Sequence, residues 1–338
     1  MNKIICIVGP TASGKTKLAV ELAKSAQGGP ASGWNGSEII SADSRQVYKG
    51  LDIGTGKDLN EYGKVKYHLI DICEPEEKFT LFDWLKLARK KIKELHQKNI
   101  LPIIAGGTGL YVQALVEGFQ LAPANFKVQN STFKSISNDK ISKCKSNQYT
   151  RKALEKKSLQ QLRKIYDRLL TTDNKLDLNN PHRLIRAIEK AQKGLEPTKS
   201  KPNFEILQIG ITLPRAKLYE KIDRRVDERF AKEKMLEEVA GLFNKGIDPK
   251  WLMALGLEYR IISSYLLDNF KVQNPNFKSI SNDKVRNTPE YKQMAQELKN
   301  KTHAFARRQL TWFRRFPEIN WVKNSREAEL LVRNFLKD

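Results

Sequence analysis

The sequence predicts an α/β fold, in which a parallel sheet forms the core and a mostly helical subdomain is inserted into the chain. Two observations indicate the core. Short apolar runs alternate with helical patterns over the first 121 residues, and these runs are apolar on both faces, as in parallel sheets that helices cover on each side. A third observation indicates the insertion: long charged amphipathic helices follow from about residue 150, and an apolar run returns at 204–213.

The predicted elements alternate along the chain. Strands are expected at 3–8, 38–42, 68–72, 100–105 and 204–213, and helices at 15–26, 80–99, 110–118, 158–170 and 182–194. A chain of 338 residues with 40% hydrophobic content can bury a substantial core, and about 150 residues per domain is usual. We therefore predict a core of residues 1–121 and 204–338 and a helical insertion of residues 122–203.

The positive charge is concentrated in the later part of the chain. The net charge is +23, of which residues 1–121 carry +3 and residues 122–338 carry +20. A lysine-rich composition without functional meaning is the alternative, but it does not favour such asymmetry. The charge therefore predicts a polyanionic partner, most simply a nucleic acid.

Cysteine usage and hydropathy exclude several protein classes. Cys6, Cys73 and Cys144 are scattered without a CxxC pair, which argues against a disulfide framework or a zinc site. No apolar run approaches the about 18 to 20 residues of a membrane span, and the N-terminal run lacks a signal-peptide cleavage site. We expect a cytoplasmic protein without a membrane partner.

One segment occurs twice. FKVQNSTFKSISNDK at 126–140 recurs as FKVQNPNFKSISNDK at 270–284, with two differences. Its polar composition cannot form a core. We interpret both copies as insertions in surface loops, with basic RNA-contacting arms as the alternative.

GPTASGKT, at 9–16, fits the phosphate-binding P-loop pattern of NTPases. It also follows a predicted strand and begins a helix, which is the context that this pattern requires. Backbone N–H groups and the helix N-terminus are expected to face phosphate oxygens. The expected phosphate-binding residues are Gly9, Pro10, Thr11, Ala12, Ser13, Gly14, Lys15 and Thr16, with the Thr16 hydroxyl on Mg²⁺. The pattern is typical of nucleotide- and ATP-binding proteins, but it does not distinguish a nucleotide from another diphosphate.

Two other predicted strands end in polar residues. SADSRQVY places Asp43, Ser44, Arg45 and Gln46 at the end of the second strand, and AGGTGLY places Thr108 at a later strand-to-helix turn. Ligands of α/β domains bind at these carboxyl ends. From the residues alone, Asp43 is either a catalyst or a helix cap, and Thr108 belongs either to a site or to an ordinary turn.

Six segments in order resemble the signature of the bacterial tRNA dimethylallyltransferase (tRNA isopentenyltransferase) family. They are GPTASGKT, EIISADSRQVYKGLDIGTGK, HLIDI followed by EP, PIIAGGTGLY, NNPHRLIRAIE and ARRQLTWFRR. The resemblance covers nearly the whole chain, apart from the duplicated segment and the 26–37 loop. It implies a P-loop NTPase-like core with a tRNA-binding helical insertion.

The resemblance also implies a reaction. The dimethylallyl group of dimethylallyl diphosphate moves to N6 of the adenine 3′ of the tRNA anticodon, and diphosphate leaves. Residues 11–16 hold the diphosphate, Lys15 and Thr16-bound Mg²⁺ stabilise its growing charge, and Arg224 or Arg225 also reaches it. Asp43 orients the amine and accepts its proton, and Thr108 belongs to the same catalytic group.

Family positions that contact tRNA also match this sequence. They are Asp43, Ser44, Arg45, Gln46, Thr108, Arg151, His182, Arg183, Leu184, Ile185 and Arg186. His182 departs from the glutamine common in the family, and GLEY at 256–259 departs from GYKE. The adenine is expected to flip out of its stack. The family also implies a monomer with no obligate protein partner.

Three rival functions remain open at this point. An adenylate isopentenyltransferase shares the donor site but accepts AMP or ATP, and such relatives lack a long basic helical part. The P-loop alone favours a small-molecule or nucleoside kinase. A non-catalytic RNA-binding protein needs only the basic part, although the intact GKT beside DSRQ argues against it.

Overall fold

The computed structural model describes residues 2–25, 33–121, 149–169, 178–192, 198–270 and 283–337. The chain divides into two compact units: Met1–Gly118 with Lys201–Asp338, and Phe119–Ser200. The first copy of the duplicated segment lies outside the described residues, and so does most of the second, at 271–282. Cys144 also lies outside them.

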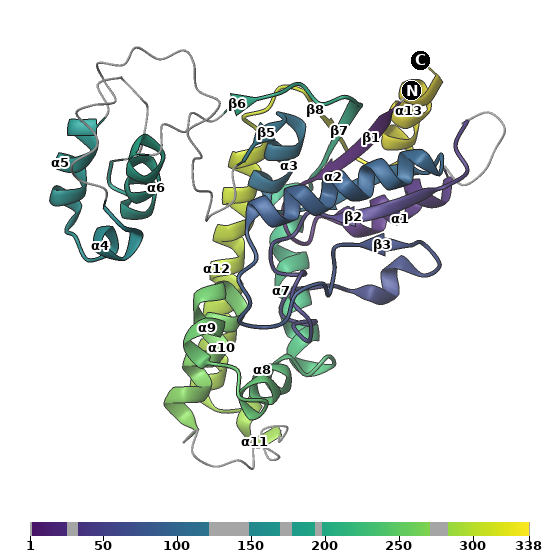
Figure 1. The fold of residues 1–338 in the computed structure, drawn as a ribbon. Helices are drawn as coiled ribbons and strands as arrows, with labels where there is room; N and C mark the ends of the chain where they lie inside the picture. The colour runs from purple at the N-terminus through teal and green to yellow at the C-terminus, as the bar shows by residue number, and fades with distance from the viewer. Residues whose placement is uncertain are drawn as a thin grey trace. The chain divides into compact units, whose positions relative to one another are not determined.

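Six strands of the described chain form one parallel sheet in the larger unit (Figure 1). They are β1 (Lys3–Val8), β2 (Ser37–Ser41), β3 (Tyr67–His68), β4 (Leu101–Gly106), β7 (Glu205–Ile211) and β8 (Ile319–Val322). Their order is β3-β2-β4-β1-β7-β8. The predicted α/β class is confirmed, and the apolar run near 204–213 returns to the sheet as β7, parallel to β1.

Two strands differ from the prediction. The run at 68–72 was expected to be a strand, but only Tyr67 and His68 pair with β2. The backbone then turns, because Leu69 and Asp71 have φ values of 62° and 55°, which lie in a left-handed region that no strand uses. β8 was not predicted, since INWV is too short and too polar to show a strand pattern.

Helices cover both faces of the sheet. α1 (Lys15–Ser25) and α13 (Ser325–Lys337) pack together on one face, whereas α2 (Leu81–Gln97) and α3 (Gly109–Val116) pack on the other. α2 begins with a capping box in which Thr80 and Asp83 each satisfy the other's backbone N–H. The Trp84 indole on α2 donates to the Ser41 carbonyl at 2.9 Å, which fixes this helix against the end of β2.

The remaining helices of this unit form a second core below the sheet in the view of Figure 1. Apart from η1 (Leu59–Tyr62), which packs against α1 and buries Tyr62 in the core of the sheet, they are α7 (Arg215–Ala231), α8 (Met235–Asn244), α9 (Pro249–Leu255), α10 (Leu257–Asn269), α11 (Asp283–Arg286) and α12 (Pro289–Phe313). The long α12 packs against both α7 and α10.

The described part of the smaller unit consists of three helices and a short antiparallel pair of strands. α4 (Arg151–Glu155), α5 (Leu159–Leu169) and α6 (Pro181–Gln192) enclose an apolar core, and β5 (Phe119–Gln120) pairs antiparallel with β6 (Thr198–Lys199). The predicted helical patterns at 158–170 and 182–194 therefore form helices. Throughout the described ranges, none of the helices combines the length and the apolar character that a membrane crossing needs.

Both described cysteines are buried and unpaired. Burial raises the pKa of Cys6 to about 12 and the pKa of Cys73 to about 11. These thiols stay protonated near neutral pH, and a protonated thiol is a poor nucleophile. Their role is packing.

Residues 51–58 form a loop between β2 and η1. Helices that lie more than 170 residues later in the sequence anchor this loop. The Glu238 carboxylate on α8 accepts the backbone N–H groups of Asp52, Ile53 and Gly54 at 2.8, 2.7 and 3.0 Å. The same carboxylate accepts the Tyr259 hydroxyl at 2.9 Å. Glu238 thus binds four donors at once.

Lys57 closes the 51–58 loop from inside. Its side chain is 1% exposed, and its ammonium donates to the Tyr48 carbonyl at 2.8 Å, to Asp52 at 2.5 Å and to Asp71. Three N–H groups therefore meet three acceptors, which is the condition under which a buried ammonium is tolerated.

Replacing Glu238 by alanine is expected to lower the free energy of unfolding by about 2 to 4 kcal/mol. The substitution removes several hydrogen bonds to a charged acceptor, worth about 1.5 to 3 kcal/mol each before the loop amides regain water. Urea denaturation measures the loss. Glu237→Ala on the same helix turn is the matched control and should stay within about 0.5 kcal/mol of wild type. Equal stability of the two variants would contradict the anchoring.

Candidate functional site

Three turns, each of which follows a strand, meet at one edge of the sheet. β2, β4 and β1 are neighbours, and they are followed by residues 43–46, 106–108 and 9–16 respectively. Because the strands are parallel, their carboxyl ends lie side by side, where α/β domains bind ligands. The P-loop, Asp43 and Thr108 are therefore brought together as the sequence predicts.

The P-loop has the backbone of a phosphate cradle. Gly9 has φ 154°, and a Cβ there would lie 2.2 Å from the Ile211 carbonyl oxygen on β7. Only glycine lets the loop cross this strand so closely. The hydroxyl of Ser13 is buried and has no hydrogen-bond partner within the described chain, so it is a donor that a phosphate oxygen can satisfy.

Lys15 is the cation of this loop. Its ammonium donates to the Pro10 carbonyl at 2.6 Å. Burial, and then the charge of Arg225, lower the pKa of Lys15 to about 8, while the carboxylate of Asp43 acts in the opposite direction. Lys15, Arg225 and Asp43 are therefore close enough to influence one another electrostatically.

Asp43 forms a local turn and also belongs to the site. Its Oδ1 accepts the backbone N–H groups of Arg45 at 2.8 Å and of Gln46 at 3.4 Å. Both bonds fall on the same oxygen, so the turn does not use Oδ2. No helix begins at Asp43, so the carboxylate closes a turn and caps no helix; a reactive role is compatible with this turn because it needs only Oδ2.

The side chains around Asp43 are tied to the protein. Thr108 Oγ1 accepts the Ser44 N–H at 3.0 Å and lies 3.4 Å from Ser44 Oγ. Gln46 accepts the Ser41 hydroxyl at 2.9 Å and donates to the Gly56 carbonyl at 2.9 Å. These contacts give Thr108 and Gln46 a role in holding the Asp43 turn, beside the substrate contact that the resemblance implies.

A residue of α12 that the sequence did not single out joins two of the turns. Gln309 is 7% exposed. Its Oε1 accepts the Thr11 N–H at 2.8 Å, and its Nε2 donates to the Gly107 carbonyl at 2.9 Å. The Thr11 amide is thereby committed to Gln309, whereas the resemblance implied that it faces the diphosphate. The sequence held one sign of this role: Gln309 is a polar residue in register with the apolar residues that form the buried face of α12.

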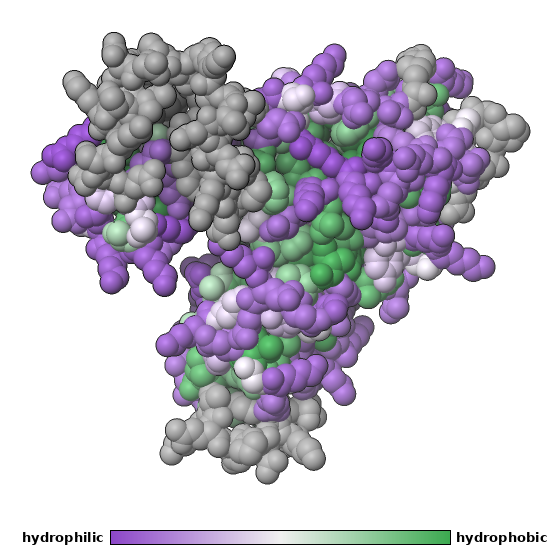
Figure 2. All heavy atoms as spheres, viewed as in Figure 1, coloured by the Kyte–Doolittle hydropathy of each residue, from purple (hydrophilic) through white to green (hydrophobic). Residues whose placement is uncertain are grey.

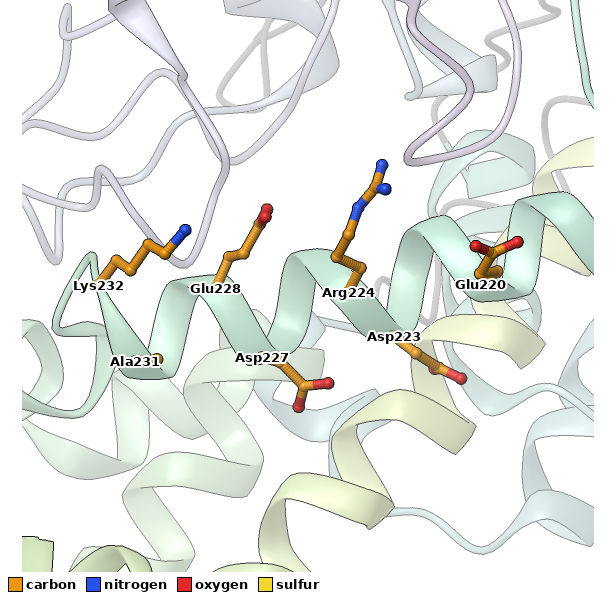
Figure 3. A pocket seen from close by; sticks show the side chains of 7 residues that line it. All are labelled: Glu220, Asp223, Arg224, Asp227, Glu228, Ala231 and Lys232. Carbon is orange, nitrogen blue, oxygen red and sulfur yellow. The ribbon is translucent and has the colours of Figure 1, made fainter.

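The two arginines left open by the sequence lie on different faces of α7. Arg225 bonds Asp58 at 3.2 Å, and its charge acts on Lys15. Arg224 instead lines an open hollow with Glu220, Glu228 and Lys232 (Figure 3). Arg224, Glu228 and Lys232 extend from one side of the helix in this view, and Asp223 and Asp227 extend from another. Arg225 is thus the arginine on the side of the P-loop.

Gly56 lets the guanidinium groups approach the 51–58 loop. A Cβ on Gly56 would lie 2.0 Å from Arg225 Nη2 and 2.3 Å from Arg229 Nη2. Asp58 pairs with both arginines, at 3.2 and 3.5 Å. Glu258, in the atypical GLEY segment, adds a second acid: burial raises its pKa, and the charges of Arg229 and Arg225 oppose that shift.

In the smaller unit, the predicted RNA-contacting residues divide into exposed and buried ones. Arg151 and Arg186 both reach Glu189 at 3.3 Å, and His182 and Arg183 are exposed. Leu184 and Ile185, however, are 0% and 3% exposed. Their side chains pack in the core of the unit and support α6 from inside, and contact of these two positions with RNA stays a prediction.

The residues present fit a P-loop magnesium ion better than a metal cage made by the protein. Within the described ranges, no three His, Cys, Asp or Glu side chains gather as a metal site. Thr16 lies in the first turn of α1, directly after Lys15, and is partly exposed. One hydroxyl of this kind, completed by phosphate oxygens and water, is the usual protein contribution to Mg²⁺ in such loops.

Comparisons with known proteins show the family of this chain. The family described as IPP transferase matches residues 46–316, and that described as isopentenyl transferase matches residues 2–67. The chain is 38% identical over 330 residues to tRNA dimethylallyltransferase 2 of Treponema denticola, which covers 94% of this chain and 95% of that protein. It is 37% identical to tRNA dimethylallyltransferase 2 of Shewanella sediminis, over 95% and 93% of the two chains.

Among solved structures, the chain is similar to the full-length tRNA isopentenylpyrophosphate transferase of Bacillus halodurans. The TM-score is 0.63 at 30% identity, and the match covers 99% of this chain and 96% of the other. Sequence and structure thus agree over almost the whole length. The chain belongs to the IPP transferase family, together with the tRNA dimethylallyltransferases.

Proposed function

We propose that this protein transfers the dimethylallyl group of dimethylallyl diphosphate to N6 of the adenine 3′-adjacent to the anticodon in tRNA, releasing diphosphate. Family membership supports the reaction. The observation that carries its mechanism is the position of the P-loop and the Asp43 turn, which follow β1 and β2, the two strands on either side of β4. One turn suits a departing diphosphate, and the other suits an attacking amine.

The donor is bound through its phosphates. The Ser13 hydroxyl and the Lys15 ammonium lie in the P-loop, and Arg225 faces it from α7. As the allylic C–O bond breaks, negative charge grows on the leaving diphosphate, and fixed positive groups stabilise it. The Thr16 hydroxyl would hold Mg²⁺, which would add positive charge beside the leaving group.

The five-carbon group needs an apolar surface. Figure 2 shows apolar side chains gathered in the middle of the viewed face of the larger unit, between the part that holds the sheet and the part that holds α8 to α10. Apolar walls exclude water, which would otherwise capture the allylic carbon as its positive charge develops.

The acceptor is oriented by Asp43. Oδ1 is used by the turn, so Oδ2 is the oxygen that accepts a hydrogen bond from the exocyclic amine. A neutral aryl amine is a weak nucleophile, and it loses a proton as the new C–N bond forms. A carboxylate at this position directs the nitrogen lone pair to the allylic carbon and takes that proton.

The tRNA partner accounts for the charge distribution. Residues 122–338 carry +20 of the net charge of +23, and α6 of the smaller unit presents His182, Arg183 and Arg186 on its exposed side. Such groups contact phosphates and fix the register of the RNA. The target adenine leaves its stack to reach the strand ends. We expect a cytoplasmic monomer that needs no protein partner.

The assay that tests the function offers purified protein radiolabelled dimethylallyl diphosphate with tRNA, with AMP, or with no acceptor. Label in tRNA, found as N6-dimethylallyladenosine by nucleoside mass spectrometry, is expected. Label in AMP would indicate the free-nucleotide enzyme. Consumption of ATP with the donor left intact would indicate a kinase and refute the proposal.

Asp43→Asn should lower kcat by about 10² to 10⁴-fold, the usual contribution of a general base. The variant keeps Oδ1 for the Arg45 and Gln46 amides, so the turn stays folded, but it places an NH₂ group where the acceptor oxygen stood. Binding of tRNA should stay within about threefold of wild type in a filter-binding assay. Turnover near wild type would remove Asp43 from the mechanism.

The pKa of Lys15 predicts the pH dependence of donor capture. Free enzyme with a lysine pKa of about 8 carries the ammonium below that pH and loses it as the pH rises. kcat/KM for dimethylallyl diphosphate, which reports free enzyme, should therefore be level below pH 8 and decline above it. Lys15→Arg keeps its charge at every pH in this range, so its profile should lack the decline whatever its overall rate. A wild-type profile that stays level to pH 9.5 would contradict the assignment.

A further inference from the structure

Gln309 occupies an unusual position for a side chain of the C-terminal helix α12. It lies on the buried face of the helix, between Ala306 and Phe313, which are 0% and 2% exposed. A primary amide at such a place needs both a donor and an acceptor as partners. Gln309 finds them on two different turns of the site, at Thr11 and Gly107.

In the proposed function, each of the two turns serves a different substrate. Thr11 is in the P-loop, on the donor side. Gly107 precedes Thr108, whose hydroxyl accepts the Ser44 N–H at 3.0 Å, next to Asp43 on the acceptor side. The Thr108 N–H also donates to the Ala42 carbonyl at 3.2 Å. A chain of hydrogen bonds therefore runs from the donor loop through Gln309 to the carboxylate turn.

The fit around Gln309 is close. A Cβ on Gly107 would lie 2.5 Å from Gln309 Nε2, so glycine is required for the amide to reach the carbonyl. The Thr11 N–H is engaged by Gln309, which leaves the later part of the loop, with Ser13 and Lys15, to the phosphates. The bond thus removes the Thr11 amide from the donors that the loop can offer to a ligand.

We infer that Gln309 is a positioning residue that aligns the donor turn with the acceptor turn, and so sets the approach of the amine to the allylic carbon. It touches neither substrate. The inference rests on the proposed function. Its effect follows from the sensitivity of a displacement reaction to geometry, since a misplacement of about 1 Å can cost about a hundredfold in rate.

Only an amide satisfies both partners. Methionine matches the volume but leaves the Thr11 N–H and the Gly107 carbonyl unpaired. Glutamate can still accept from Thr11, but its second oxygen faces the carbonyl oxygen of Gly107 and repels it. The added negative charge also lies near Lys15, whose Cε would be 3.9 Å from a Cβ on Gly107.

The test compares Gln309→Met and Gln309→Glu with wild type in single-turnover transfer to tRNA, with enzyme in excess. This rate constant describes each productive complex and does not depend on the fraction of enzyme that is folded. We expect Gln309→Met to lower it about 10- to 100-fold, with both KM values within about threefold of wild type. Gln309→Glu should lower the rate similarly and also raise the KM of the donor.

Thr302→Val is the matched control. Thr302 is a buried polar residue of the same helix, 6% exposed, and its hydroxyl donates only to the Leu298 carbonyl one turn earlier. This variant reports the cost of a polar-to-apolar change in α12 away from the strand ends, and its single-turnover rate should match wild type. Thermal denaturation of all variants measures stability in parallel.

Single-turnover rates of Gln309→Met and Gln309→Glu within twofold of wild type would overturn the inference. A rate loss shared equally by Thr302→Val would overturn it too, because the effect would then belong to the helix as a whole. If Gln309→Met does not fold, Gln309→Glu, which keeps a polar group on Thr11, decides the question. Failure of wild-type enzyme to modify tRNA would refute the proposed function instead.

Discussion

The backbone hydrogen bonds that pair β2, β4 and β1 in parallel hold three turns from distant parts of the sequence at one edge of the sheet. A phosphate cradle, a glycine turn with Thr108 and a carboxylate turn become neighbours without any contact between their side chains being required. Helices on both faces shield these strands from water, so the pairing is stable. The later helices then refine the arrangement, since Gln309, Arg225 and Glu238 all reach it from the chain beyond residue 200.

Charge in the larger unit is organised by proximity to this edge. Burial lowers the pKa of both Lys15 and Arg225; the charge of Arg225 lowers that of Lys15 further, and the charge of Arg229 lowers that of Arg225 further. The carboxylate of Asp43 offsets part of the shift of Lys15, and that of Asp58 offsets part of the shift of Arg225. Such a cluster of positive groups is tolerable in the free protein because of these acids, and it becomes favourable once a diphosphate brings its own negative charge.

Local patterns were sufficient for the sheet and the P-loop, because strand alternation and GPTASGKT act over short stretches. They failed where tertiary contacts decide the conformation. The chain turns away from β3 at Leu69 and Asp71, because Asp71 pairs with Lys57. The HLIDI run at 68–72 gives no sign of this distant ion pair. The choice between Arg224 and Arg225 depends on which face of α7 meets the P-loop, and Gln309 does not stand out from the rest of ARRQLTWFRR until its helix is placed. Leu184 and Ile185 show the reverse case, in which a motif match included residues that serve the core.

The reactivity of Lys57 reports whether the 51–58 loop is closed or open. An ammonium whose three protons are all engaged, on a side chain that is 1% exposed, cannot attack an acylating reagent until the loop opens. Acylation at this one amine, read by peptide mass spectrometry beside the many surface lysines, would therefore count openings of the loop separately from melting of the sheet.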